Sequence, residues 1–349
     1  MTMTNETFTN LTTPRVGYVL PILVLLAVGA AILVGNEACS TDAGCVEGAK
    51  EIWRGYFPDW VRKALRALVQ FVLSPWLWIL MLCVGLAERF RPARENQKIF
   101  STGAAHDIVA WLLIDKLGFG LLVASVFSYS AAVALYEDHF AFLTIQGVDQ
   151  LPQTARFVLA FVFADFLNWL HHLIRHKVRA FWVFHAVHHS QREMNLFTDD
   201  RIHPFDKLIA MPIMLYPTMV LQLDLPLVPW LLVAQMLYTH TYHGNLRTDY
   251  GPLRYVFVTP QSHRIHHSMS PEHADKNFGV IFCVWDRLFG TQMDATGEYP
   301  LTGVDDPTFP AETDGTLLGI LKTYVHQFIY PFQQIWRRIT TGEWELPAG

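Results

Sequence analysis

The chain has 349 residues, of which 52% are hydrophobic and only 16% are charged. Soluble domains are about 45–50% apolar and about 25% charged, so the low charge indicates a membrane protein. The net charge of −5 argues against a nucleic-acid-binding protein, and the 24 Phe, 12 Tyr and 11 Trp residues argue against a disordered chain.

Four apolar segments predict about four transmembrane helices, because about 20 apolar residues cross a bilayer. The first two, residues 16–34 and 68–87, belong to an N-terminal unit of residues 1–100. Between them lie Cys39 and Cys45, which could form a disulfide in an oxidising compartment or be two ordinary loop thiols. Residues 117–136 and 157–170 predict the third and fourth spans.

Two further apolar stretches, residues 208–223 and 225–237, are rich in proline and predict a helical hairpin. Basic residues follow the second span (Arg89, Arg91, Arg94) and the fourth (Arg175, Lys177, Arg179). Positive charge flanks the cytoplasmic ends of membrane helices. We therefore expect the hairpin to return to the cytoplasm, and residues 296–349 to be a cytoplasmic tail whose amphipathic segment 317–339 lies on the membrane surface.

Histidine is concentrated in one window: 13 of the 16 histidines lie between His171 and His273. They form one HxxxH cluster and two HxxHH clusters, namely His172 and His176; His185, His188 and His189; and His263, His266 and His267. On a helix, this spacing puts the imidazoles of a cluster on one face. Imidazole suits iron, zinc, copper and nickel, and so many rings exceed the needs of one ion. The clusters therefore predict two metals in a cap on the cytoplasmic side of an all-α membrane protein.

Single histidines outside the clusters are more ambiguous. His243 lies at the cytoplasmic end of the last apolar stretch, so it can reach the same point as the clusters. His203 and His240 could be metal ligands or active-site residues, or hydrogen-bonded residues at helix ends. Asp165 lies inside an apolar span, where a carboxylate is costly and tends to be functional. We expect it to accept the second N–H of a ligand histidine, with Asp200, Asp275 and Asp286 as other candidates.

Four segments in this order carry a family resemblance: DFLNWLHHLIRH, FWVFHAVHHS, TPQSHRIHHS and DKNFGVIFCVWDRLFGT. Over about residues 100–295 the chain resembles the fatty acid hydroxylase/sterol desaturase superfamily, with some similarity to the alkylglycerol monooxygenase branch. We expect residues 101–295 to be the di-iron domain. The family's first motif usually has Tyr-Trp before the first histidine of the box and Arg after it, where this chain has Asn168-Trp169 and Leu173.

The resemblance implies two irons, which zinc can replace in a purified sample. The implied ligands are His172, His176, His185, His188, His189, His243, His263, His266 and His267. It also implies O2 as co-substrate, a lipid or other hydrophobic substrate from the bilayer, and electrons from a separate ferredoxin- or cytochrome-type donor. We expect a hydroxylase in a bacterial inner membrane; a desaturase of the same family, or less readily a zinc-dependent membrane hydrolase, stays open.

Overall fold

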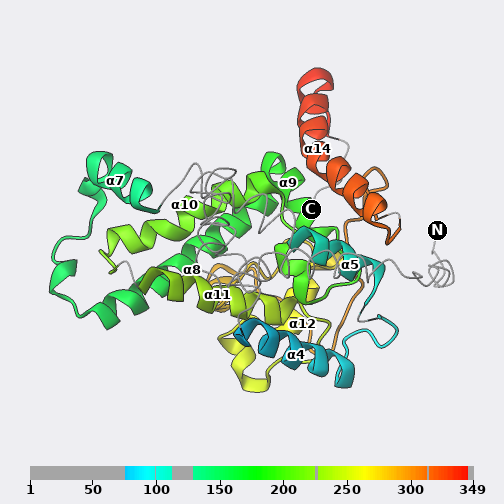
Figure 1. The fold of residues 1–349 in the computed structure, drawn as a ribbon, viewed down its shortest axis with the longest axis horizontal. Helices are drawn as coiled ribbons and strands as arrows, with labels where there is room; N and C mark the ends of the chain where they lie inside the picture. The colour runs from blue at the N-terminus through cyan, green and yellow to red at the C-terminus, as the bar shows by residue number, and fades with distance from the viewer. Residues whose placement is uncertain (1–74, 99, 112–128, 225–226, 313, 345–349) are drawn as a thin grey trace, which may run out of the picture.

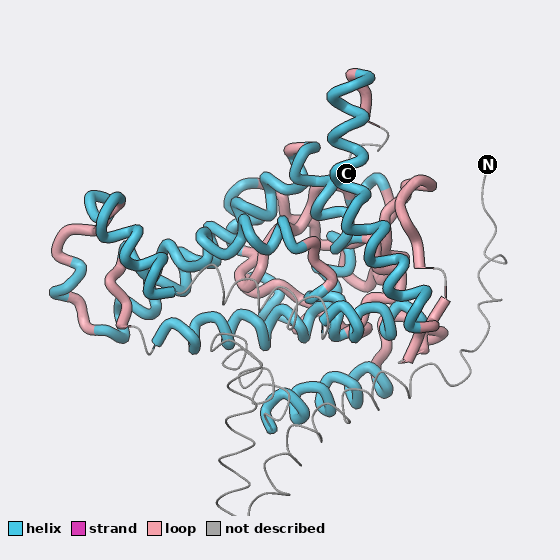
Figure 2. Tube along the Cα trace, turned by 45° about the horizontal axis from the view of Figure 1, so that its top comes forward, coloured by secondary structure: helices cyan, strands magenta, loops and turns pink. Residues whose placement is uncertain are grey.

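The computed structural model describes residues 75–98, 100–111, 129–224, 227–312 and 314–344. This part of the chain is helical, with three isolated bridges and no strand (Figure 2). The predicted span at residues 16–34, the Cys39–Cys45 loop and most of the span at 117–136 lie outside the described residues.

The central helix is α8 (Gln153–Lys177), which contains the predicted fourth span. Among the described helices it is the one long and apolar enough to cross a membrane. It continues beyond the predicted apolar segment, because HHLIRHK favours a helix as much as the apolar residues before it. Val178 then turns the chain, and α9 (Arg179–His189) begins at once and packs against α8.

The predicted hairpin forms α10 (Pro204–Val220) and α11 (Val228–His243). α10 lies along α8, and α11 runs on the other side of α8 in the view of Figure 1. Small and branched side chains fill the contact between these helices: Ala160, Ala164, Leu221 and Leu231 are buried together. The C-terminal ends of α8 and α11 carry histidines of the site described below.

Shorter elements surround this body. They are α4 (Pro75–Phe90), α5 (Thr102–Val109), α7 (Tyr129–His139), α12 (Pro260–His266), α13 (Val284–Phe289) and the 3₁₀ segments Ala141–Leu143, Val148–Gln150, Leu196–Asp200, Gly251–Tyr255 and Pro271–His273. The 3₁₀ segment Leu196–Asp200, η4, contacts α4, α5, α9 and α11. A capping box at Asn195 and Thr198 closes its N-terminus.

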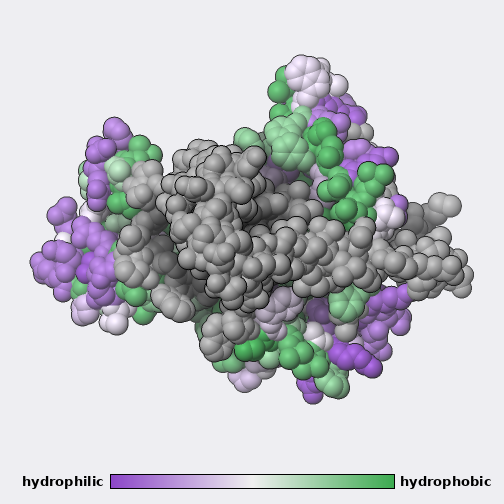
Figure 3. Space-filling view, in the orientation of Figure 1, coloured by the Kyte–Doolittle hydropathy of each residue, from purple (hydrophilic) through white to green (hydrophobic). Residues whose placement is uncertain are grey.

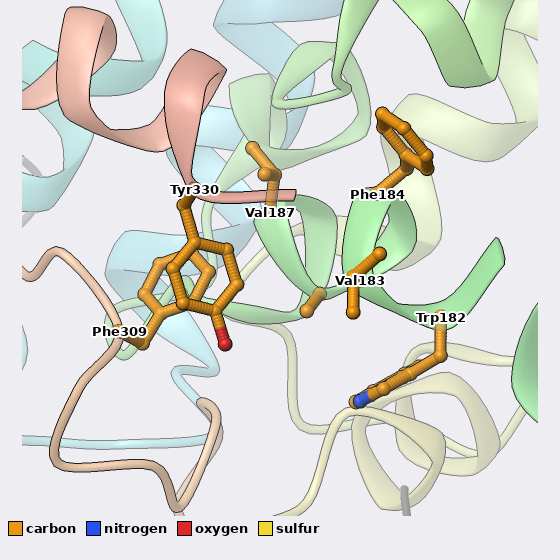
Figure 4. Packing of buried hydrophobic residues seen from close by; sticks show 7 residues of the cluster. Trp182, Val183, Phe184, Val187, Phe309 and Tyr330 are labelled. Atoms are coloured by element: carbon orange, nitrogen blue, oxygen red, sulfur yellow. The ribbon is translucent and has the colours of Figure 1, made fainter. Parts of the chain in front are cut away.

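The last helix, α14 (Leu317–Thr341), packs one side on α9 and projects from the body (Figure 1). Its Tyr330 joins Phe309 and five residues of α9, among them Trp182, Val183 and Val187, in a buried cluster (Figure 4). Large apolar side chains cover another side of α14 and are exposed, as the green surface over this helix shows (Figure 3).

Candidate metal centre

Nine buried histidines gather in two groups. In each group, one ligand nitrogen per ring lies within 4.8 Å of every other. One group holds five rings, His172, His176, His185, His189 and His266; the other holds four, His188, His243, His263 and His267. We call them the five-histidine and the four-histidine group. Together they are the nine residues that the family resemblance implies as ligands.

Four helices supply these rings. His172 and His176 lie one helical turn apart on α8, and His243 is the last residue of α11. α12 carries His263 and His266, and His267 caps its C-terminus. α9 serves both groups, because His185 and His189 face the five-histidine group while the intervening His188 faces the other. The HxxHH spacing therefore places α9 between the two groups.

The ring nitrogens that point into each group face one another, and too few of them carry a proton for every nitrogen to be hydrogen-bonded. In the four-histidine group, the Nε2 of His263 lies 2.8 Å from that of His243 and 3.1 Å from that of His267. In the five-histidine group, the Nε2 atoms of His172, His185 and His266 are buried and have no hydrogen-bond partner. Buried polar nitrogens are nearly always paired, so this convergence of lone pairs fits metal cations.

The outward nitrogens of several rings are fixed by backbone carbonyls. The Nδ1 of His172 lies 2.9 Å from the Phe278 oxygen, and that of His266 lies 2.8 Å from the Lys276 oxygen. A carbonyl only accepts, so Nδ1 carries the proton and Nε2 keeps its lone pair for a metal. This arrangement of a ligand ring and its outer acceptor is typical of metal sites.

Burial also keeps the rings neutral. It lowers the pKa of His266 to about 3 and holds the pKa values of His188, His263 and His267 well below the ordinary value. Neighbouring imidazoles lower these pKa values further. A metal binds neutral imidazole, so no proton competes for these nitrogens at neutral pH.

Two of the sequence candidates lie outside both groups. The Nδ1 of His203 accepts the N–H of Phe205, and its Nε2 donates to the Phe328 oxygen at 3.1 Å. His240 has Asp199 3.0 Å from Nδ1 and Asp200 2.8 Å from Nε2. Neither ring has a lone pair left for a metal, so the structure assigns both to helix-end contacts rather than to the groups.

The predicted role of Asp165 also needs correction. Its carboxylate accepts the backbone N–H groups of Ile281 and Phe282 and the indole N–H of Trp285, and none of these bonds goes to a ligand histidine. Asp165 therefore fixes the segment after Phe278 rather than an imidazole. Asp286 acts on the same segment: it accepts the N–H groups of Phe278 and Gly279.

The other carboxylates do not match the prediction. Asp275 pairs with Lys177, and Asp200 pairs with His240. The carboxylates that do contact ligand rings are Asp206, 3.1 Å from Nδ1 of His185, and Asp199, 3.4 Å from Nδ1 of His243. Sequence reasoning missed both, since neither stands at a helical spacing from its histidine.

Comparison with known proteins finds a matching family model and several relatives. A model described as fatty acid hydroxylase matches residues 157–291, a segment that contains all nine histidines. An ornithine lipid hydroxylase of Rhizobium tropici is 28% identical over 74% of this chain and 75% of its own length. An alkylglycerol monooxygenase of Xenopus tropicalis is 32% identical over 67% of this chain and 48% of its own. The matched model and these relatives are consistent with the fatty acid hydroxylase/sterol desaturase superfamily, which this chain resembles.

The relatives are named hydroxylase or monooxygenase, and these names support an oxygenase. A methylsterol monooxygenase of Rattus norvegicus is a further relative, 30% identical over 36% of this chain and 42% of its own. The chain spans less than half the length of the alkylglycerol monooxygenases that it matches. No solved structure matches the chain.

Proposed function

We propose that this protein is a membrane-bound di-iron enzyme that hydroxylates a C–H bond of a lipid with O2 and electrons from a separate donor. The observation that carries the proposal is the pair of buried histidine groups within the matched segment. The five-histidine group would hold one iron and the four-histidine group the other. Bound irons would supply the reduction of O2 that hydroxylation of an unactivated carbon requires.

The residues around the groups supply a dry and fixed setting. Trp182 lies against His176 with ring centroids 4.9 Å apart, and Tyr242 lies against His263 at 4.3 Å. Phe278 is fully buried beside His176 and offers its carbonyl to His172. These aromatic rings exclude water from the nitrogens, which protects a reactive site from side reactions.

A membrane lipid is the substrate class that we propose. The relatives are named for an ornithine lipid and for alkylglycerol, both of which join a polar head to long hydrocarbon. Val158 and Leu159 are exposed near the N-terminal end of α8, and the C-terminal turns of the same helix carry histidines of the site. The helix therefore offers such a molecule an apolar surface that leads toward the site. A chain lying along α8 in the bilayer would point toward those turns.

The proposed membrane arrangement follows from the basic residues at this end of α8. Arg175, Lys177 and Arg179 surround the turn between α8 and α9, on the side where the histidines gather. We propose about four spans and a hairpin in a bacterial inner membrane, with the histidine cap facing the cytoplasm. A ferredoxin- or cytochrome-type carrier would deliver electrons at that face.

Metal content and product mass test the proposal together. Full-length protein from iron-supplemented, zinc-poor medium should contain about two irons per chain, and His189→Ala and His267→Ala should each lose iron, because these rings lie in different groups. With reductant, O2 and bilayer lipids, a product about 16 mass units heavier is expected. A product about 2 units lighter would instead indicate a desaturase. One zinc that persists in excess iron, with turnover in the absence of O2, would overturn the oxygenase and favour a hydrolase.

A further inference from the structure

We propose that Asp206 and Asp199 are matched positioning residues, each orienting one histidine of one metal site, and that a buried cation fixes each carboxylate in turn. This inference rests on the proposed function, since it assigns the groups to two metals. It concerns two carboxylates that lie close together in the sequence, between His189 and the middle of α10, yet serve different groups.

The first arrangement belongs to the five-histidine group. Asp206 lies in the first turn of α10, where the helix N-terminus favours a negative charge. Its Oδ2 lies 3.1 Å from Nδ1 of His185 and 2.9 Å from Nη1 of Arg175. Asp206 is buried, and Arg175 is only 13% exposed at its side chain, so the pair is shielded from solvent.

The protonation of His185 follows from its neighbours. Arg175 Nη1 also lies 3.3 Å from Nδ1 of His185, but if Nδ1 accepted from it, the proton would sit on Nε2. That Nε2 is buried and has no acceptor. Donation from Nδ1 to Asp206 gives the proton an acceptor and leaves the Nε2 lone pair facing the other rings.

The second arrangement belongs to the four-histidine group. The Nδ1–H of His243 donates to the Thr239 oxygen at 2.8 Å, and Asp199, in η4, places Oδ1 3.4 Å from the same Nδ1, so this carboxylate acts on the ring through its charge. The hydroxyl of Thr239 donates to Oδ2 of Asp199 at 2.7 Å. His240 lies 3.0 Å from the same Oδ2.

His240 occupies the place that Arg175 has in the first arrangement. Both of its ring nitrogens face carboxylates, Asp199 and Asp200, and carboxylates only accept hydrogen bonds. His240 therefore carries two protons and a positive charge. The two arrangements have the same order of histidine, carboxylate and cation, namely His185–Asp206–Arg175 and His243–Asp199–His240.

The matched carboxylates differ from the other outer partners in charge. His172 and His266 donate to backbone carbonyls, which carry only partial charges. A full negative charge beside the outer N–H makes an imidazole a stronger metal ligand, and loss of such a partner typically weakens metal affinity about 10–100-fold. Each proposed site thus has one charge-supported ring.

The test uses full-length protein loaded with iron enriched in the Mössbauer-active isotope. His172→Ala and His263→Ala assign the spectral components to the five- and four-histidine groups. We expect Asp206→Asn to shift the first component and to weaken that iron's retention against a chelator about 10–100-fold, and Asp199→Asn to do the same to the second. His240→Gln should shift the second component, as a further variant that leaves both carboxylates in place. Asp294→Asn, which removes an exposed partner of Arg287 2.8 Å away, is the matched control and should change neither.

The outcomes separate this inference from the proposed function. Wild-type protein that binds no iron would refute the proposed function and the inference with it. Two irons in the wild type, with spectra and retention unchanged in both Asn variants and in His240→Gln, would overturn the inference alone. Equal loss of both irons in each variant would also overturn it, because a merely structural role weakens both sites together.

Discussion

Replacing Asp107 with alanine should destabilise the protein more than any single surface substitution. Asp107 and Arg201 are both buried, and Arg201 Nε lies 2.6 Å from Oδ1 of Asp107. The other oxygen of Asp107 accepts from Gln191 at 2.6 Å, Asn195 at 2.8 Å and Thr198 at 3.0 Å. The alanine variant would leave these donors and the Nε of Arg201 without their acceptor, while Glu312 and Ser190 would still accept from the other guanidinium nitrogens.

The magnitude follows from the burial of the pair. Breaking a buried ion pair on one side costs about 3–5 kcal/mol. In a domain of 150–250 residues each kcal/mol lowers the melting temperature by about 2–4 °C, so we expect a loss of about 6–20 °C. Burial lowers the pKa of Arg201, while Asp107 and Glu312 raise it above its ordinary value. The guanidinium stays charged when Asp107 is removed, because arginine is not deprotonated in proteins and Glu312 remains beside it.

Thermal unfolding in detergent, followed by tryptophan fluorescence, measures this loss. Asp294→Ala is the control, because it breaks an exposed ion pair worth about 0–1 kcal/mol. The double variant Asp107→Leu, Arg201→Met should recover much of the loss, since apolar side chains of similar volume can replace a buried pair. If Asp107→Ala melts within about 2 °C of Asp294→Ala, the reasoning from buried charge is refuted.

Three further predictions concern the site, the last helix and pH. Gly279→Ala should reduce the iron bound by the five-histidine group, because its new Cβ would lie 2.7 Å from a Val258 methyl and 2.9 Å from the Phe282 oxygen. The clash would shift the neighbouring Phe278 carbonyl, which fixes His172. Iron per chain measures this loss, and the control Gly85→Ala, with open space around its Cβ, should change nothing. α14 should bind the surface of anionic vesicles, because it exposes Leu318, Val325 and Trp336 and carries no acidic residue. A polarity-sensitive dye attached to Trp336→Cys should then report a less polar environment than the same dye on Gln333→Cys, and equal signals would refute surface binding. Metal-free protein should lose stability as the pH falls below about 6.5, because histidines of the unfolded chain then take up protons, whereas a folded ring such as His266, whose pKa is lowered to about 3, does not. Each such ring lowers the free energy of unfolding by about 1.4 kcal/mol per pH unit. Equal melting temperatures at pH 7.5 and 5.5 would contradict this prediction.

The sequence predicts the histidines of the site well because their spacing is a local property. HxxxH and HxxHH put rings on one helical face wherever the helix lies, and the nine rings do converge. Which rings share a group is not local. His188 joins His243, His263 and His267 because the histidines at the ends of α11 and α12 meet its ring, and no spacing within HxxHH contains this contact.

Carboxylates are harder to predict than histidines. Burial of Asp165 follows from the apolar residues around it, and the structure buries it. Its partners, Ile281 and Trp285, are more than a hundred residues away, so the sequence indicates the cost of burial but not the bonds that offset it. Asp206 and Asp199 have ordinary surroundings in the sequence, and only the fold brings them to ligand rings.

The positions of the rings along their helices give the site a common physical basis. Seven of the nine lie in the last turn or at the C-cap of a helix: His176 on α8, His188 and His189 on α9, His243 on α11, and His263, His266 and His267 on α12. A helix C-terminus carries about half a negative charge, and each favours a nearby cation by about 0.3–1 kcal/mol. Four C-termini that converge on one place thus favour cations there. The same ends supply unpaired carbonyls, such as that of Thr239, to orient the rings. Neutral imidazoles bring no charge of their own, and Asp199 and Asp206 are each paired with a cation, so this convergence of helix ends offsets part of the charge of the metals that we propose.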